Sequence, residues 1–371
     1  MEQEKIFWVG FNLVKGIGSA RMRRLLDFFG SAEQAWRAEN EALLAAGLSP
    51  KLAAALGQVR QGETLDKTLE TIDRTGIQVV IWNDLEYPRR LKEIDHPPPV
   101  LYISGELSET DPGAVAVVGT RRVTAYGRQV TEEIGRDLAI NGVCVISGLA
   151  RGVDALAHQA ALRNGGRTLA VLGSGLDQIY PPEHRSLADQ ICEHGALISD
   201  YPPGTAPDAA NFPPRNRIIA GMAQAVIVVE AGEKSGALIT AAFAAEQGRE
   251  VFAVPGYLYA PQSRGTNQLI RAGAHIYLNI EDILRTLNMT RLEMHRTARS
   301  ILPSDSTEAT LFALLGREPM HVDAIQEQAE LPVEQVTAVL TIMELKGLVR
   351  QVGGMRYIAV FEQQAEYDTE E

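Results

Sequence analysis

The chain has little cysteine, no long apolar run and fewer basic than acidic residues, and the first two shortages each exclude a class of protein. Two cysteines among 371 residues cannot form a disulfide framework, and Cys144 and Cys192 lack metal-ligand spacing, so we expect both to be buried thiols. No apolar run approaches the roughly 20 residues of a membrane-spanning helix. Residues 1–5 carry acids where a secretory signal carries positive charge. We therefore expect a cytoplasmic protein.

Basic residues are outnumbered, because 35 Lys and Arg stand against 47 Asp and Glu, a net charge of −12. A nucleic-acid partner normally requires a basic surface. The acids are concentrated near the C-terminus, however. Residues 305–371 hold 13 acids and 4 bases, a local charge of −9 that leaves −3 for residues 1–304. A nucleic-acid site is therefore allowed in residues 1–304, provided that Arg and Lys gather there locally.

The length suggests two or three domains. We predict a helical domain over 1–75, a core over 76–300, a winged-helix domain over 305–361 and an acidic tail over 362–371. In the first, apolar residues recur at helical spacing between Met22 and Phe29. The run Val14–Ala20 places two glycines before a basic helix and resembles the hairpin of a helix-hairpin-helix module, whose N–H groups can hold a phosphate. Glycine also commonly separates two helices, so a purely structural cap is equally open.

The core alternates apolar runs with helical patterns, which predicts an α/β fold with a doubly wound parallel sheet covered on both faces. Ligands of such sheets bind beyond the carboxyl ends of the strands. The predicted strands are Val79–Trp82, Val100–Ile103, Val115–Val118, Val143–Ile146, Thr168–Leu172, Ala196–Ile198, Ala225–Val229, Val251–Val254 and Ala274–Tyr277.

After a linker at Ser300–Ser306, three helical patterns and a hairpin with a Gly-Gly turn predict a small winged helix. Its third helix, Val333–Leu345, contains Glu334 and Glu344, and a single Lys346 lies just beyond its end. Because this helix offers no Arg or Lys for a phosphate backbone, we expect it not to bind DNA.

Four loops at predicted strand ends are rich in glycine, and basic residues occur in three of them. Glycine lets the backbone approach a ligand, and a following helix N-terminus adds positive potential, so we expect an anionic ligand rather than four structural turns. The loops are Gly119–Arg122, Ser147–Gly152, Gly173–Gly175 and Gly232–Gly236.

The anion is predicted to be a nucleotide chain. The dinucleotide fingerprint and the P-loop spacing are both absent, whereas several phosphate sites along one sheet edge suit a polyanion. The run Asn211–Arg217 adds Phe212, on which a base can stack, next to Arg215 and Arg217. Alternatively, Phe212 is a core residue and the arginines pair with acids such as Asp200 or Asp208.

Asp154 and His158 lie one helical turn apart, a spacing that can support general base chemistry. No Ser or Cys nucleophile is tied to them by a motif, so we interpret Asp154 as a helix cap and His158 as a packed core residue. The seven histidines show no metal-ligand spacing. We therefore predict no catalytic residue, no metal and no cofactor.

Six further motifs occur in order along the chain: Val118–Arg121, Ile146–His158, Val171–Asp177 with Tyr180-Pro181, Phe212–Gly221, Ser235–Ala241 and Phe252–Gly256. With these motifs in this order, essentially the whole chain resembles the DNA-processing protein A family (DprA, also called Smf). The resemblance implies a sterile-alpha-motif-like or helix-hairpin-helix N-terminal domain, an extended Rossmann-like core and, as in many family members, a C-terminal winged helix. It also implies a homodimer that binds and protects incoming single-stranded DNA during natural transformation, loads the RecA recombinase and performs no catalysis.

The resemblance assigns roles to three residues. Arg121 matches the arginine that holds a phosphate, Phe212 a position where a base stacks, and Thr240 a pocket residue. Thr120 stands where the family has Ser and keeps the hydroxyl. With the loops above, the candidate DNA-binding residues are Gly119, Thr120, Arg121, Ser147, Gly148, Arg151, Gly152, Gly173, Ser174, Gly175, Asn211, Phe212, Arg215, Asn216, Arg217, Lys234, Ser235, Gly236 and Thr240.

Two other functions remain open. The core also looks distantly like nucleotide hydrolases of the lysine-decarboxylase-like group, although their Pro-Gly-Gly-x-Gly-Thr-x-x-Glu run is missing at Val229–Gly236. A transcription regulator is suggested only by the winged helix.

Overall fold

The computed structural model describes residues 3–108, 111–287, 306–315, 320–329, 331–345, 349–351 and 355–359. The chain forms two compact units, Met1–Glu293 and Met294–Glu371. The helices predicted over 1–75 belong to the same compact unit as the sheet, so a domain boundary at residue 75 stays a prediction. Within the described ranges, no helix has the length and apolar character needed to cross a bilayer.

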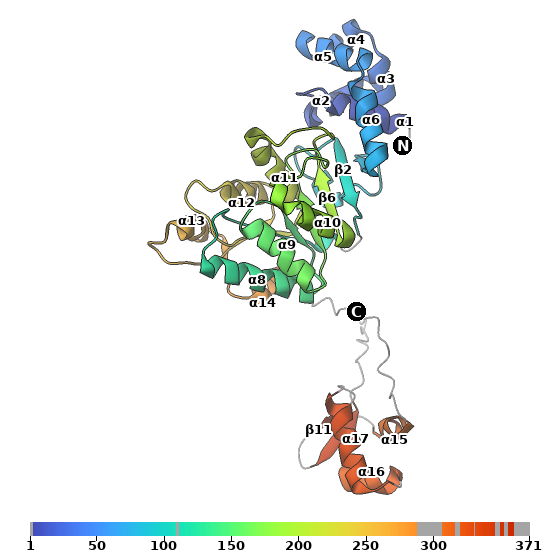
Figure 1. Cartoon of the computed structure of the whole chain (residues 1–371), viewed down its shortest axis with the longest axis vertical. Coiled ribbons are helices and arrows are strands. Elements are labelled where there is room, and N and C mark those ends of the chain that lie inside the picture. Colours follow the sequence, from blue (N-terminus) through green and yellow to red (C-terminus); the bar gives the residue numbers. More distant parts are fainter. Residues whose placement is uncertain are drawn as a thin grey trace, which may run out of the picture. The chain divides into compact units, whose positions relative to one another are not determined.

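The chain begins with six helices, which lie beyond the β1–β2 end of the sheet (Figure 1). Met22 and Leu25 of the predicted helical pattern are buried, whereas Phe28 is 55% exposed and does not belong to the core. Trp8 packs edge-on against Trp82 with ring centroids 5.7 Å apart, which joins these helices to the sheet region. The helices are α1 (Gln3–Asn12), α2 (Ser19–Phe29), α3 (Ala32–Arg37), α4 (Asn40–Ala45), α5 (Pro50–Gln61) and α6 (Thr64–Thr75).

All nine predicted strands are present and form one sheet in the order β1-β2-β6-β5-β4-β3-β7-β8-β9. The sheet is mostly parallel, as predicted, but β2 runs antiparallel to both β1 and β6. An apolar run reveals that a strand is buried but not its direction. The strands are β1 (Gln78–Ile81), β2 (Val100–Gly105), β3 (Val115–Val118), β4 (Val145–Ser147), β5 (Thr168–Val171), β6 (Ala196–Ser199), β7 (Ala225–Val228), β8 (Glu250–Ala253) and β9 (His275–Ile276).

Helices cover both faces of the sheet, as predicted. Along β3, Val115 and Val117 belong to one apolar core with α8, α9 and α14, while Ala116 and Val118 belong to a second core with α11 and α12. This alternation is the period of two expected for a strand buried on both sides. The helices are α7 (Arg89–Lys92), α8 (Ala125–Ile140), α9 (Val153–Arg163), α10 (Arg185–His194), α11 (Phe212–Met222), α12 (Gly236–Glu246), α13 (Arg264–Arg271) and α14 (Ile280–Thr286).

The strand order reverses at β3. From β3 the chain adds β4, β5 and β6 on one side, and then returns to place β7, β8 and β9 on the other. The loops that follow β3 and β7 therefore diverge, which opens a crevice at the carboxyl ends of these two strands.

The second compact unit is a winged helix. Its described residues form three helices and a three-stranded sheet in the order β10-β12-β11, around a core that includes Leu311, Ile325 and Leu340. The predicted linker up to residue 305, Lys346 and the acidic tail lie outside the described residues. The elements are α15 (Ser306–Leu314), β10 (Met320–His321), α16 (Val322–Ala329), α17 (Val333–Leu345), β11 (Val349–Gln351) and β12 (Arg356–Ala359).

His158 of α9 is a core residue. Its ring is fully buried, and Nδ1 lies 2.6 Å from Thr168 Oγ1. Because the Thr168 hydroxyl already donates to Val145 O, Nδ1 is the donor and Nε2 carries the lone pair, with no hydrogen-bond partner among the described residues. Burial, helped by the charges of His184 and Arg215, lowers the pKa of His158 to about 3. The imidazole is therefore neutral and out of reach of a ligand.

The buried His158 should make the fold sensitive to acid. In the unfolded chain its pKa is about 6.5, so between pH 6.5 and about 3 the unfolded state binds a proton that the folded state does not, and the free energy of unfolding falls as pH falls. We expect about 2 kcal/mol of loss from this group between pH 7 and pH 5. Denaturant titrations of the wild type and His158→Gln at both pH values measure it.

Between pH 7 and pH 5, the free energy of unfolding of His158→Gln should fall by about 2 kcal/mol less than that of the wild type. This difference does not depend on how stable the variant is at pH 7. His194→Gln, at an exposed histidine, is the matched control and should behave as wild type. Equal acid losses in wild type and His158→Gln would contradict the prediction.

Candidate nucleic-acid interface

A cavity of about 740 Å³ lies at the carboxyl ends of β3 and β7. Four cationic side chains and one carboxylate contribute to its wall, so its local charge is opposite to that of the whole chain. The polar, glycine and aromatic residues of the wall include Gly119, Thr120, Arg121, Arg122, Asp154, Tyr180, Phe212, Arg215, Asn216, Lys234, Ser235, Gly236 and Thr240.

Phe212 stands between arginines at the start of α11. The guanidinium carbon of Arg121 lies over its ring, 5.5 Å from the centroid, and that of Arg215 lies 5.6 Å from the same centroid. The ring of Tyr180 is 5.9 Å away. Phe212 itself is only partly buried, so it is not the core anchor that the alternative interpretation required. Two aromatic rings and two cations thus meet at one place in the cavity.

Arg121 carries a charge that the described part of the chain does not neutralise. Its side chain is exposed, and no carboxylate lies within ion-pair distance of it in the described ranges. Lys234 lies across the cavity in the loop after β7. Its side chain is also exposed, and the described residues place no carboxylate within ion-pair distance of it. These two cations remain available for an anionic ligand.

Arg215, in contrast, is buried and fixed. Its Nη1 donates to Gly148 O at 3.0 Å and to Val171 O, at the carboxyl ends of β4 and β5. Burial lowers the pKa of Arg215 to about 10, although the nearby Asp154 carboxylate acts in the opposite direction. The guanidinium therefore stays charged at neutral pH, and from its buried place in the wall it adds positive potential to the cavity.

Asp154 serves the loop after β4. Its Oδ2 accepts hydrogen bonds from the N–H groups of Gly148 and Ala150, at 3.2 and 3.3 Å. Burial raises the pKa of Asp154, and the charge of Arg215 opposes the rise. The predicted helix cap is therefore wrong, because α9 begins after Gly152 without a side-chain cap and Asp154 binds N–H groups of the preceding loop. No hydrogen bond joins Asp154 to His158 among the described residues.

The loop after β3 is held from two sides. Thr120 N donates to Glu230 O at 2.8 Å, and Thr124 at the start of α8 donates through its backbone N and its hydroxyl to the Glu230 carboxylate. On the other side, Thr120 O accepts from Val153 N at 3.2 Å. Gly152 makes this approach possible, because it has φ 80° and a Cβ there would lie 2.3 Å from Thr120 O.

In the loop after β7, Ser235 caps α12 by accepting from Ala237 N at 3.3 Å. Thr240 lies one turn further along the helix, buried in the wall. Asn216 of α11 donates to Gly236 O at 3.3 Å and so joins α11 to this loop.

The structure brings ten of the predicted residues together in the cavity wall: Gly119, Thr120, Arg121, Phe212, Arg215, Asn216, Lys234, Ser235, Gly236 and Thr240. The other nine do not line it: Ser147, Gly148, Arg151, Gly152, Gly173, Ser174, Gly175, Asn211 and Arg217.

Several of these nine have structural partners instead. Ser147 is buried and donates to Val117 O at 2.6 Å, which braces two strands. Arg151 pairs with Glu183 at 2.6 Å, and Ser174 donates to Gln178 O at 2.8 Å. Gly173 lies directly behind Phe212, because a Cβ there would be 3.1 Å from the ring. The loop after β5 therefore supports the aromatic ring from outside the cavity.

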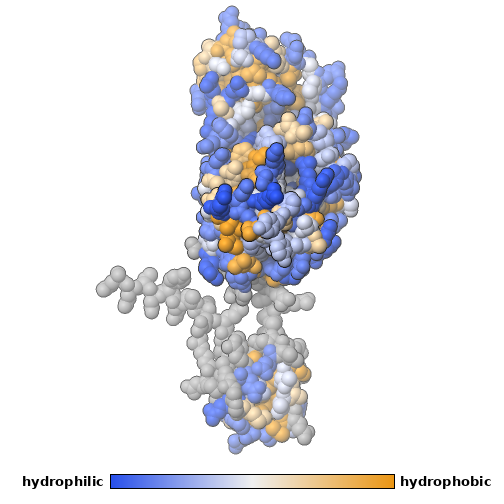
Figure 2. All heavy atoms as spheres, turned by 90° about the vertical axis from the view of Figure 1, so that its left-hand side faces the viewer, coloured by the Kyte–Doolittle hydropathy of each residue, from blue (hydrophilic) through white to orange (hydrophobic). Residues whose placement is uncertain are grey.

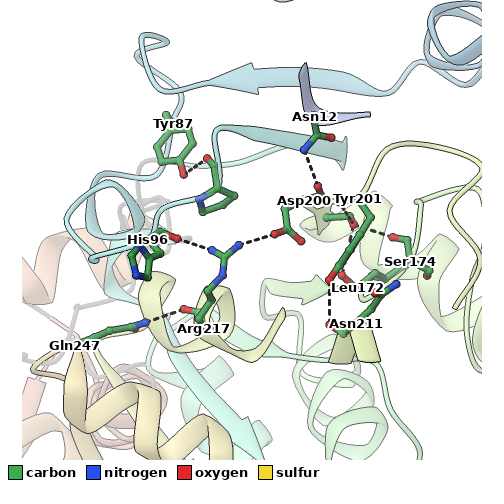
Figure 3. A network of polar contacts seen from close by, with 12 residues as sticks. Asn12, Tyr87, His96, Leu172, Ser174, Asp200, Tyr201, Asn211, Arg217 and Gln247 are labelled. Carbon is green, nitrogen blue, oxygen red and sulfur yellow. Dashed lines mark hydrogen bonds and ion pairs between the residues drawn. The ribbon is translucent and has the colours of Figure 1, made fainter. Parts of the chain in front are cut away.

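Arg217 follows the alternative interpretation. It points away from the cavity to Asp200, whose carboxylate lies 2.7 Å from Nη2, and it donates to His96 O at 2.8 Å (Figure 3). Gln247 donates to Arg217 O at 3.2 Å. Arg217 thus ties α11, α12 and the loop after β6 together.

Sequence reasoning missed Arg122, Tyr180 and Asp154 as wall residues. Arg122 directly follows Arg121 in a loop already singled out, so the adjacent cation was a usable signal. Tyr180 is 36% exposed and precedes Pro181 after β5. An aromatic-proline pair is a weaker sequence signal for a binding residue than an adjacent arginine. Among the described residues, no cluster of three His, Cys, Asp or Glu side chains could hold a metal ion.

Comparisons with known proteins agree with this geometry. Residues 78–288 match the family model of DNA recombination-mediator protein A, and residues 295–355 match that of the DprA winged helix domain. Protein Smf of Synechocystis sp. is 38% identical, over 95% of this chain and 98% of its own length. DNA processing protein DprA of Bacillus subtilis is 42% identical, over 64% of this chain and 80% of its own length.

Two solved structures have the same fold. The crystal structure of DNA processing protein A from Streptococcus pneumoniae gives a TM-score of 0.68 at 33% identity, and covers 76% of this chain and 97% of that one. The second is a structure of DNA processing protein A from Helicobacter pylori, described as giving insight into its single-stranded DNA binding mode. Its TM-score is 0.51 at 32% identity, and the match covers 58% of this chain and 97% of that one. This chain belongs to the DNA recombination-mediator protein A family.

Proposed function

We propose that the cavity binds single-stranded DNA through Arg121, Arg122 and Lys234, and that Phe212 and Tyr180 offer rings on which bases stack. The observation that carries the proposal is the unpaired Arg121 guanidinium lying over the Phe212 ring. Single-strand sites combine a positively charged groove with aromatic platforms. The Helicobacter pylori relative, whose title names single-stranded DNA binding, supports the same ligand.

The site is proposed to bind rather than to catalyse. Asp154 is occupied by backbone N–H groups, and His158 faces Thr168 in the core. The remaining wall residues offer phosphate contacts and stacking, but no activated nucleophile beside a base. The proposal therefore excludes the nucleotide hydrolase that the core fold also suggested.

We further propose that the bound strand is handed to the RecA recombinase by a homodimer in the cytoplasm. The family description as a recombination mediator supports a recombinase partner. In the described part of the chain, β9 pairs only with β8, and Ile276 and Leu278 beside its free edge are 48% and 72% exposed. Figure 2 looks onto the side of α13 and shows apolar atoms among hydrophilic ones there. This edge is a surface available to a second copy.

Removing the Arg121 charge should weaken DNA binding without affecting the fold. One charge-assisted contact is worth roughly 1.5–3 kcal/mol, so Arg121→Ala should lose about 10- to 150-fold in oligo-dT affinity and show a shallower salt dependence. Fluorescence anisotropy at several salt concentrations measures both. Arg163→Ala removes an exposed cation at the far end of α9 and is the matched control.

Duplex DNA and AMP complete the experiment. Tight oligo-dT binding without AMP turnover supports the proposal, whereas AMP hydrolysis supports the enzyme. If Arg121→Ala keeps both the wild-type melting temperature and the wild-type affinity, Arg121 does not hold a phosphate.

Phe212 should contribute by stacking rather than by charge. Phe212→Ala is expected to cost roughly 1–3 kcal/mol of binding while leaving the salt slope nearly unchanged, because stacking releases no counterions. Phe212→Trp should bind nearly as wild type, and Phe212→Leu, which keeps apolar volume without a ring, should behave like the alanine variant. A large drop in melting temperature for Phe212→Ala, with unchanged affinity, would make Phe212 a structural residue.

The winged helix should be dispensable for single-strand affinity. The hydroxyls of Thr337 and Thr341 on α17 donate to backbone oxygens of their own helix, and residues 305–371 carry a net charge of −9 that repels DNA. A chain ending at Ser304 should therefore bind oligo-dT nearly as tightly as the full chain at physiological salt. If the shortened protein is folded yet loses tenfold, about 1.4 kcal/mol, the winged helix is a DNA-binding module.

A further inference from the structure

A second cavity, of about 840 Å³, lies where the turn between α1 and α2 meets the loop after β6. It is larger than the cavity of the proposed function, and none of the roles assigned above uses it. The residues that matter are Lys15, Gly18, Ser19, Ala20, Arg21 and Arg24 on the helical side, and Asp200, Tyr201, Asp208 and Asn211 on the sheet side.

The two walls of this cavity are joined by direct hydrogen bonds. Asn12, at the end of α1, donates to Asp200 O at 3.3 Å, and its Oδ1 accepts from the Tyr102 hydroxyl at 2.9 Å. Tyr201 donates to Asn211 O at 3.4 Å and closes the loop after β6 on itself (Figure 3). The cavity is therefore a feature of one compact unit.

The two cavities share a wall. Along one short stretch of chain, Pro207, Ala209 and Phe212 line the first cavity, while Asp208 and Asn211 line the second. A strand whose base stacks on Phe212 thus reaches the rim of the second cavity at the neighbouring residue. The stretch that both cavities border includes a single 3₁₀ helix, Ala209–Asn211.

The helical wall is basic. Lys15, Arg21 and Arg24 are exposed, and none has a carboxylate within ion-pair distance in the described ranges. Arg21 folds back to donate to Gly16 O at 2.6 Å, which holds its guanidinium at the turn. Arg24 lies against Gly47, where a Cβ would be 2.7 Å from its Nη1. These contacts give the two arginines defined positions.

Of the two acids on the opposite wall, Asp200 has a cationic partner and Asp208 has only a backbone N–H partner among the described residues. Asp200 pairs with Arg217 at 2.7 Å, and Asp208 accepts from Ala210 N at 2.9 Å. The three cations therefore dominate the charge that the cavity offers to a ligand. The uncapped first turn of α2, at Gly18 to Ala20, adds potential of the same sign.

We propose that the second cavity holds the phosphate backbone of the same single strand as it leaves Phe212. The inference rests on the proposed function and extends it, because it makes the helical N-terminal part of the chain a portion of the DNA path. Lys15, Arg21 and Arg24 contact phosphates and confer no base preference. The bound strand is then longer than the first cavity alone can cover.

Strand length separates the two cavities. The test measures binding of oligo-dT of two lengths, about six and about 20 nucleotides. Single-strand-binding folds cover about 4 to 16 nucleotides, so the short oligonucleotide lies within that range and the long one exceeds it. A variant with Lys15→Ala, Arg21→Ala and Arg24→Ala should lose tenfold or more for the long oligonucleotide and keep wild-type affinity for the short one. Its salt slope for the long one should become shallower by about 2.

Two further variants sharpen the result. Arg74→Ala removes an exposed cation of α6 that lies outside the cavity, and should bind both lengths as wild type. Arg21→Glu reverses one exposed charge without touching the core, so it should weaken only the long oligonucleotide even if the triple variant folds poorly.

Unchanged binding of the long oligonucleotide by the triple variant and by Arg21→Glu overturns the inference. So does an equal loss for both lengths, or a loss confined to duplex DNA. Arg121→Ala should weaken both lengths, which separates the two sites. A wild-type protein that binds neither length refutes the proposed function itself, and this extension with it.

Discussion

The buried guanidinium of Arg215 is the contact on which the candidate site depends. It donates to Gly148 O and Val171 O, and so ties α11 to the carboxyl ends of β4 and β5, the strands beside which Phe212 is presented. A buried cation is costly unless its donors are satisfied and an opposite charge is near. Asp154 supplies that charge and is itself held by Gly148 and Ala150. The loop after β4, the start of α11 and the Phe212 ring therefore form one unit.

The different roles of Arg215 and Arg217 follow from helix geometry. Residues two apart on a helix point about 200° away from each other, so the two side chains cannot enter the same cavity. Since Arg215 faces Phe212, Arg217 has to face the loop after β6, where Asp200 is its partner. The sequence already contained this constraint, and applying it would have removed one of the two arginines from the predicted site.

Much of the fold could be predicted, because buried strands appear in the sequence as short apolar runs. All nine strands of the main sheet were located in this way. The direction of β2 could not, since burial is the same for parallel and antiparallel strands. The site was predictable to the level of its loops. Which loops meet depends on the strand order, and β3 and β7 are neighbours although four helices separate them in the chain. Ser147 was assigned to the site because it ends a strand, but its hydroxyl braces Val117 O from within the sheet.

The acidic composition and a polyanionic ligand are compatible because charge acts locally. At physiological ionic strength exposed charges are screened beyond about 8 Å, so the acids of residues 305–371 oppose DNA only where they come close to it. Around the first cavity, Arg121, Arg122 and Lys234 face a single carboxylate that is already bonded to backbone N–H groups. Local charge, rather than net charge, therefore decides whether a nucleotide chain can bind. The net charge of the chain, taken alone, would have excluded nucleic acids from the candidate ligands.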